Sequence, residues 1–222
     1  MNLLKRNING NSYVGAFSAS SEKLTLISNG VSPKDESIIR ENLATETHRL
    51  SINGSNLIGI YAVLNSNGVL LPEIAYAEEM RELNSLKERI RIGALPGDMN
   101  ALGNNILAND KIAIINPNFD KSASDMIADV LDVEIIRMSI GGYETVGANN
   151  ILTNNGMVLN NFASDKELDM AKDLVGNVSQ STANTGSVFI GLASVANTKG
   201  LIVGEDTTGF ELARMEEGLT DQ

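Results

Sequence analysis

The sequence predicts an α/β fold in which one unit, with the order strand, strand, helix, strand, is repeated five times. Three observations support this fold: a regular spacing of glycines, turn-forming residues after each glycine, and helix-capping residues at a fixed distance from it. The glycines recur every 44 residues along the 222-residue chain, and a period of this length is typical of repeat architectures. These marker glycines are Gly15, Gly59, Gly103, Gly147 and Gly191.

A hairpin is expected at the start of each unit. The residue before each marker glycine is aliphatic and the segment after it is apolar, as in residues 60–64, which predicts a first strand there. Asn and Gly, which tolerate positive φ, follow at residues 65–68 and 153–156, so the chain should turn back. The returning strands are continuously apolar, which predicts burial on both faces; they are residues 24–27, 69–71, 112–115, 157–159 and 201–203.

A helix should begin 17 residues after each marker glycine. Four of the five residues at this position have side chains that accept a hydrogen bond from the first helical turn; the five are Ser32, Tyr76, Asp120, Ser164 and Thr208. Ser164 with Glu167, and Thr208 with Glu211, have the spacing of a capping box. A third strand is expected after most helices, at residues 50–52, 90–92 and 133–138, with a weaker candidate near Val178.

We expect the units to close into a ring. Neither terminal unit shows a polar cap, and closure removes the exposed edge that an open stack would leave. A propeller blade has four strands and no regular helix, and helical-pair repeats have no hairpins, so neither alternative fits the unit. The expectation is a single domain over residues 1–222, with repeats at approximately 13–56, 57–100, 101–144, 145–188 and 189–222.

Composition excludes several functions. The chain has no cysteine, which excludes a disulfide framework, a thiolate metal site and a thiol nucleophile. No stretch approaches the roughly 18 apolar residues of a membrane span, and residues 1–13 lack the apolar core of a signal peptide. No membrane contact and a cytoplasmic location are therefore expected. The net charge of −11 disfavours a partner held through phosphates and favours a basic one.

Several segments resemble the translation initiation factor 6 family. Residues 101–104, 109–110, Pro117 and 128–134 are similar to its third repeat, and residues 204–209 with Glu211 and Leu212 are similar to its fifth. Residues 68–72 and 145–147 resemble its second and fourth repeats. The similarity covers essentially the whole chain, although the first repeat is less typical. Because no extended segment follows the fifth helix, the chain resembles the archaeal form.

The resemblance implies a pentein, or β/α-propeller, fold, which is a closed ring of five such units. It also implies a ribosome anti-association factor that is not an enzyme and needs no cofactor. Such a protein would bind the large ribosomal subunit, mainly through a ribosomal protein with limited rRNA contact, and block the small subunit. It would act in translation initiation and in large-subunit maturation as a monomer. Release factors, including a GTPase, are further partners that the resemblance implies.

Docking of this kind needs a flat, uncharged surface rather than a reactive group. The positions just after the marker glycines are uncharged in all five units and should share one face of the ring, and charge depletion is typical of interface cores. Amide side chains there offer donors and acceptors to a partner, although they could instead bond turns or neighbouring units. The candidate partner-binding residues are Gly15, Ala16, Ile60, Gly103, Asn104, Asn105, Ala148, Asn149 and Leu192.

Two other functions remain as alternatives. Amidine-modifying enzymes resemble this ring but use a cysteine nucleophile, which the chain lacks, and a structural ring could self-associate through the uncharged face. Residues 205–208 with Glu211 could suggest a cation site, but Thr208 is better explained as a helix cap. His48 has no Ser or Cys partner that would make it a catalytic base, so we expect it at the surface or at a strand edge.

Overall fold

The computed structural model of the protein describes residues 1–86 and 88–220, so Lys87 of the expected second repeat and residues 221–222 of the expected fifth lie outside the described residues. Within this range the β structure forms five separate three-stranded sheets. The first contains β2 (Ser18–Ser20), β3 (Leu24–Ser28) and β4 (Glu46–Leu50), and the second β5 (Val63–Leu64), β6 (Gly68–Pro72) and β7 (Arg91–Leu95). The third contains β8 (Ile106–Ala108), β9 (Ile112–Ile115) and β10 (Glu134–Arg137), and the fourth β11 (Ile151–Leu152), β12 (Met157–Asn160) and β13 (Val178–Ser181). The fifth combines β14 (Ser194–Ala196) and β15 (Gly200–Val203) with β1 (Asn2–Lys5) from the start of the chain.

Every sheet has the same internal pairing. The first two strands of a unit form an antiparallel hairpin, and the third strand runs parallel to the middle one. The middle strands, β3, β6, β9, β12 and β15, are buried along their whole length. This burial confirms the prediction made from their continuous apolar runs, because a strand covered on both faces has no polar side to present.

One helix joins the second strand to the third strand in each of the first four units, and a fifth helix follows β15. They are α1 (Pro33–Leu43), α3 (Ala77–Glu82), α5 (Lys121–Leu131), α7 (Asp165–Val175) and α8 (Gly209–Leu219). The helix starts are as predicted, and the side chains of Ser32, Asp120, Ser164 and Thr208 each accept a hydrogen bond from the first turn. Tyr76 also precedes its helix, but there the Glu79 carboxylate accepts a 2.8 Å hydrogen bond from the Tyr76 N–H.

The predicted first strands begin too early. Each marker glycine lies in a short turn instead, and the strand starts three or four residues later. Four of these turns are helical: η1 (Val14–Ala16), α2 (Ile58–Tyr61), α4 (Leu102–Asn105) and α6 (Val146–Asn149). The turns are apolar because their side chains, such as Ile58 and Leu102, pack into the hydrophobic clusters. The third strands also shift, since β4 begins four residues before the predicted 50–52 and β7 extends three beyond the predicted 90–92.

The fifth sheet contains a strand that the sequence did not reveal. β1 pairs in parallel with β15, with Asn2 opposite Gly200 and Lys5 opposite Val203. It takes the position that the third strand of a unit occupies elsewhere, so the start of the chain completes the last sheet. Residues 2–5 are too few and too weakly patterned to predict a strand by themselves.

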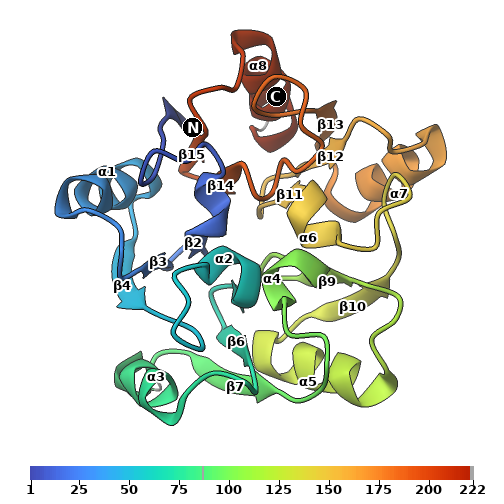
Figure 1. Cartoon of the computed structure of the whole chain (residues 1–222). Helices are drawn as coiled ribbons and strands as arrows, with labels where there is room; N and C mark the ends of the chain where they lie inside the picture. The colour runs from blue at the N-terminus through green and yellow to red at the C-terminus, as the bar shows by residue number, and fades with distance from the viewer. Residues whose placement is uncertain (87, 221–222) are drawn as a thin grey trace.

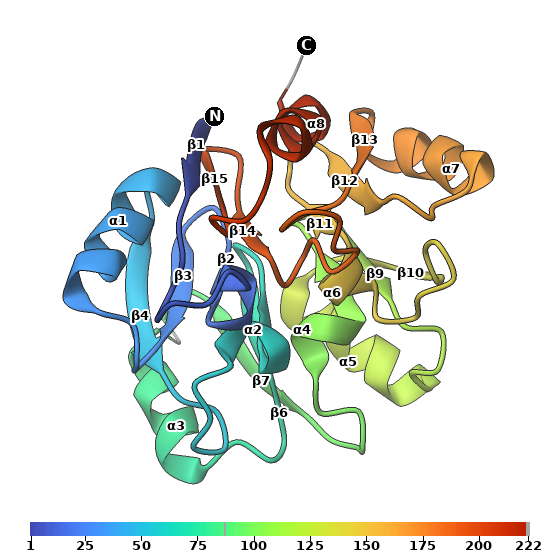
Figure 2. The same ribbon diagram turned by 45° about the horizontal axis from the view of Figure 1, so that its top comes forward.

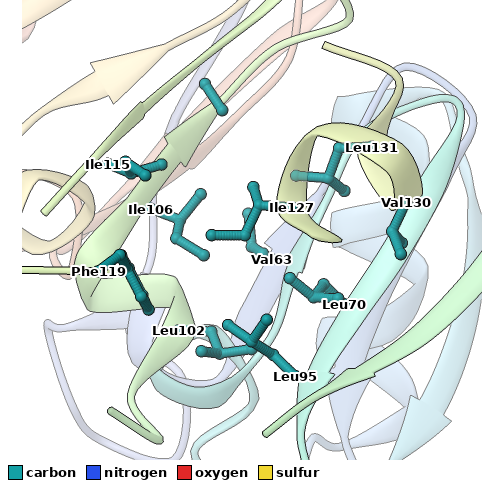
Figure 3. Packing of buried hydrophobic residues seen from close by; sticks show 11 residues of the cluster. Val63, Leu70, Leu95, Leu102, Ile106, Ile115, Phe119, Ile127, Val130 and Leu131 are labelled. Carbon is teal, nitrogen blue, oxygen red and sulfur yellow. The ribbon is translucent and has the colours of Figure 1, made fainter. Parts of the chain in front are cut away.

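The five sheets lie around a common centre, with the helices on the outside and the short turns α2, α4 and α6 in front (Figure 1). Turning the molecule brings β1 and β15 beside each other at the top, near α8 (Figure 2). Each unit shares a hydrophobic cluster with the next one, and a further cluster joins the fifth unit to the first. Figure 3 shows the cluster between the second and third units, where Val63 and Leu70 lie against Ile106 and Ile127.

Asparagines in the hairpin turns link successive units. The Asn65 amide donates to the carbonyl oxygens of Asn109 (2.9 Å) and Leu131 (2.7 Å), and the Asn109 amide donates to Thr153 O at 3.0 Å. Asn197 makes the equivalent bond from the fifth unit to Ser21 O of the first, at 3.1 Å. Tolerance of positive φ, which predicts the turn at residues 65–68, does not explain these asparagines, because none of the three has a positive φ angle. Their side chains satisfy buried carbonyl groups of the neighbouring unit.

Carboxylates at the third helical position fix a second set of loops. Glu79, Glu167 and Glu211 accept hydrogen bonds from backbone N–H groups of these loops, whereas Asp35 at the same position pairs with the Arg6 side chain. Glu79 accepts hydrogen bonds from the N–H groups of Asn53 (2.7 Å) and Gly54 (2.9 Å), which lie in a tight turn with φ of +52° and +71°. Ala123 stands at this position in the third unit, where the described residues show no matching bridged turn. The carboxylate therefore holds the turn that leads into the marker glycine.

Replacing Gly59 by Ala should destabilise the fold, because the added Cβ would overlap the backbone oxygens of Gly15 and Ser18. Overpacking of this kind costs about 1–3 kcal/mol or more. Gly209 is the matched control, since a Cβ there meets nothing within 4 Å and Ala at this helical position should stabilise by about 0.4–1 kcal/mol. Urea unfolding of both variants measures the difference, and equal midpoints would contradict the packing argument.

The stability that Glu211 provides should disappear in acid. Burial alone would raise the pKa of Glu211, but hydrogen bonds from the Thr208 N–H, the Thr182 hydroxyl and the Gly186 N–H outweigh burial and hold the pKa below its ordinary value of 4.5. Because the pKa is lower in the folded state, the contribution is complete above pH 4.5 and is lost as the pH falls through the folded-state pKa. Glu211→Gln should cost about 1–3 kcal/mol at pH 7 and progressively less in acid.

Unfolding measured from pH 7 to pH 3 checks this dependence. Glu217→Gln is the control, because Glu217 is exposed on the same helix and pairs with Arg214 at the surface. A cost for Glu211→Gln that stays constant over the whole pH range would contradict the proposed role of the carboxylate.

Candidate docking surface

The marker glycines bring the five turns into direct contact at the centre of the molecule. A Cβ added at Gly59 would overlap Gly15 O, one at Gly103 would overlap Gly59 O, and the series continues through Gly147 and Gly191. At Gly15 the overlapping atom is the carbonyl oxygen of Gly191. Each turn is therefore seated on the turn before it, and the first is seated on the fifth. Only glycine permits an approach this close.

These turns form one end of the molecule, which we call the glycine end. The last residues of the middle strands reach it, as shown by hydrogen bonds from Ser28 N to Phe17 O (3.0 Å) and from Asn116 N to Asn105 O (2.9 Å). The helices start at the same end, because each begins shortly after its middle strand. The hairpin turns lie at the opposite end, which we call the hairpin end.

The predicted candidates do not all reach the surface. Ile60, Gly103, Asn104 and Leu192 are half-buried, whereas Gly15, Ala16, Asn105, Ala148 and Asn149 are buried. The sequence therefore identified residues at equivalent positions of the repeats. The tertiary structure decides which of them face outward and which lie beneath the surface and support it.

The two buried asparagine candidates use their amides within the protein. Asn105 donates to Ala101 O at 2.9 Å and accepts from the Asn116 amide at 2.8 Å. Asn149 donates to Val188 O at 3.2 Å and accepts from the Thr145 hydroxyl at 2.8 Å. Their side chains satisfy internal groups, which is the alternative role considered for the amides from the sequence.

Asn104 differs from these asparagines. Its Oδ1 is buried and has no hydrogen-bond partner among the residues that the structure describes. An acceptor without a donor is costly in a folded protein, but an enclosed oxygen can meet a donor from outside only if the side chain rotates. Among the asparagine candidates, Asn104 is the one that is half-buried and whose Oδ1 makes no hydrogen bond to the described residues.

An uncharged disc surrounds the contact of the marker glycines. We define it as residues 13–17, 57–61, 101–105, 145–149 and 189–193, and none of these 25 residues is charged. Within it Phe189 is 40% exposed, and Tyr13, Leu57 and Tyr61 are half-buried. The sequence prediction considered only the residues after each marker glycine. It missed the residues that stand two positions before the glycine, which include Tyr13, Leu57 and Phe189.

Carboxylates surround this disc. Glu73, Asp98, Glu144, Glu205 and Asp206 are exposed on loops at the glycine end. None of them belongs to an ion pair within residues 1–86 and 88–220. Cationic side chains also occur at this end: Lys34, Lys121 and Lys166 in the first turns of three helices, and the exposed Arg137, which donates to Phe119 O at 2.7 Å. The arrangement is an apolar and amide-bearing centre with an acidic rim.

The geometry offers little for catalysis. The hollow at the centre of the molecule, lined by all five marker glycines and by the first strands of the five hairpins, measures about 120 Å³, which is below the roughly 300 Å³ of a small-molecule site. His48 lies on β4 and burial lowers its pKa, with an opposing influence from Glu82. Its Nε2 has no partner in the described part of the chain. Thr208 and Glu211 form the expected capping box.

No group of three or more metal-ligating side chains occurs among the described residues. Over the same residues, none of the helices has the length and apolar character needed to cross a bilayer.

Comparison with known proteins identifies the family. A family model described as the eIF-6 family matches residues 3–218. Translation initiation factor 6 of Thermoplasma acidophilum is 37% identical over 217 residues, covering 97% of this chain and 99% of that protein. The proteins of the same name from Thermococcus onnurineus and Picrophilus torridus are 34% and 35% identical, covering 99% and 97% of this chain and 98% and 99% of their own lengths. This chain therefore belongs to the eIF-6 family and is not an enzyme.

Proposed function

We propose that the protein binds the large ribosomal subunit through the uncharged disc and keeps the small subunit from joining it, during translation initiation and large-subunit maturation. The similar proteins named translation initiation factor 6 support a role in initiation. The observation that carries the docking proposal is the disc of 25 uncharged residues within an acidic rim. Protein interfaces have this composition, with charge depleted at the centre and polar groups around it.

The partner that best fits this surface is a basic ribosomal protein, with limited contact to rRNA. Glu73, Asp98 and Glu205 would attract cationic side chains, and complementary charge speeds encounter and fixes orientation. The same carboxylates, on a chain with a net charge of −11, would repel an extended phosphate backbone.

Within the disc we assign contact to Ile60, Asn104 and Leu192, together with Phe189. The half-buried aliphatic side chains would lose their remaining exposed surface, and the half-buried Asn104 amide would rotate so that its Oδ1 meets a donor from the partner. The other candidates, Gly15, Ala16, Gly103, Asn105, Ala148 and Asn149, would shape the disc from below. Their packing makes the surface flat and pre-organised, which lowers the entropy lost on binding.

We also propose that residues 1–222 form one domain, a closed pentein ring with the five repeats given above, and that the free protein is a cytoplasmic monomer. The contact from Gly15 to Gly191 and the pairing of β1 with β15 support closure. A rigid ring would block subunit joining by its volume alone, so no reactive group is required. A protein held this way has to be removed by other factors, and the family resemblance suggests that a GTPase is among them.

Purified protein should bind isolated large subunits in a one-to-one ratio and reduce the formation of joined ribosomes. Sucrose-gradient sedimentation of both subunits, with and without the protein, measures joining and binding together. Free migration of the protein at near-physiological salt, with joining unchanged, would refute the function. Sedimentation equilibrium of the protein alone distinguishes the alternative, because a self-associating ring would give a dimer or larger species.

Two variants at one position identify the chemistry of the partner. Ile60→Arg and Ile60→Glu both remove the aliphatic contact, but against a basic partner arginine adds repulsion that glutamate does not. We expect Ile60→Arg to weaken binding at least about tenfold more than Ile60→Glu. Ala213→Arg, on the exposed face of α8, is the matched control and should bind normally. The reverse order for the two Ile60 variants would indicate that rRNA is the main partner.

A further inference from the structure

A hollow lies at the hairpin end, between the first and second units. It consists of two adjoining depressions that share Lys23, Arg89 and Ile90. Leu24 and Leu86 line the apolar one, and Arg91 borders the polar one. Lys23 is in the turn after β2 and Arg89 lies just before β7, so the hollow is formed by segments about 66 residues apart.

The hollow lies beside a helix that differs from those of the other units. α3 covers 6 residues, Ala77–Glu82, and continues as the 3-10 helix η2 (Leu83–Leu86), whereas the other four helices have 11 residues each. Leu86, the last residue of η2, and Ile90, just before β7, are half-buried. Leu24 is 6% exposed and forms the apolar floor between them.

Three cationic side chains border this one hollow in a chain with a net charge of −11. Arg89 pairs with Glu46 at 2.7 Å and Arg91 pairs with Asp132 at 3.3 Å, and all four side chains are more than half exposed. Lys23 Nζ donates to Ser66 O at 3.3 Å. Exposed ion pairs contribute little to stability, so a partner's carboxylate can pair with Arg89 or Arg91 when Glu46 and Asp132, which also line the hollow, turn toward solvent.

We propose that this hollow is a second docking site, which binds an extended acidic peptide segment of a partner protein through one aliphatic side chain. The aliphatic side chain enters between Leu24, Leu86 and Ile90, and the flanking carboxylates pair with Arg89, Arg91 and Lys23. A single-stranded nucleic acid fits less well, because bases bind by stacking on aromatic rings and the described residues that line the hollow include no Phe or Tyr. The site is at the opposite end from the uncharged disc, so both ends can be occupied together.

The test uses the full-length protein and a fluorescently labelled octapeptide with two leucines flanked on each side by three aspartates. Fluorescence anisotropy should show saturable binding that weakens as salt is raised, because screening acts on the exposed charges. Replacing both leucines by serines should weaken binding at least about tenfold, because no aliphatic side chain would remain to enter the hollow.

Protein variants locate the site. Arg89→Gln with Arg91→Gln should weaken peptide binding at least about tenfold, and Ile90→Ser should weaken it without any change of charge. Arg81→Gln is the matched control, because Arg81 is exposed on α3, forms a comparable surface pair with Glu78 and does not border the hollow. Circular dichroism melting of each variant confirms that it is folded.

The outcomes separate this proposal from the docking of the disc. Ile60→Arg should leave peptide binding unchanged, and the Arg89 and Arg91 variant should leave large-subunit binding unchanged. The proposal is overturned by an absence of saturable binding, by equal losses in Arg81→Gln and the double variant, or by loss of peptide binding in Ile60→Arg. Binding of oligouridylate in place of the peptide would also overturn it.

Discussion

The close approach of the five marker glycines is the contact on which the remaining structure depends. Each glycine lies against a carbonyl oxygen of the turn before it, and any side chain there would overlap the neighbouring backbone. Because the turns meet at the centre, each unit packs its sheet and helix against the next, and a hydrophobic cluster forms at every junction. Backbone contacts at the centre thus determine how the apolar faces around it are buried.

The same contact creates the functional surface. Turns that are packed this tightly have little room for long charged side chains, so the glycine end has an uncharged centre and carries its charges on the surrounding loops. Glu79 and Glu211 hold two of the turns that lead into the disc by accepting several backbone hydrogen bonds each. A surface fixed in this way can dock without reorganising, which suits a protein that acts by occupying space.

At the hairpin end, the units are held together by a different kind of contact. There the units are joined by side chains, with Asn65, Asn109 and Asn197 each bonded to a carbonyl group of a neighbouring unit. Side-chain links tolerate differences between units better than glycine contacts do, because only the bonded atoms have to be in register. The shorter helix of the second unit and the hollow beside it are such a difference, and they lie at this end.

Local chemistry in the sequence determined the repeat, the middle strands and the helix starts, since turn residues, apolar runs and caps such as Ser32 and Thr208 act within a few positions. Family membership also follows from the sequence. Contacts between distant segments decided the rest: β1 is a strand only because β15 offers it an unpaired edge, and the glycine turns are helical because of their neighbours. Tertiary contacts also decided which candidates are buried. Asn104 is half-buried and Asn105 is buried, although both follow Gly103. Orientation toward solvent depends on the assembled turns and not on residue type.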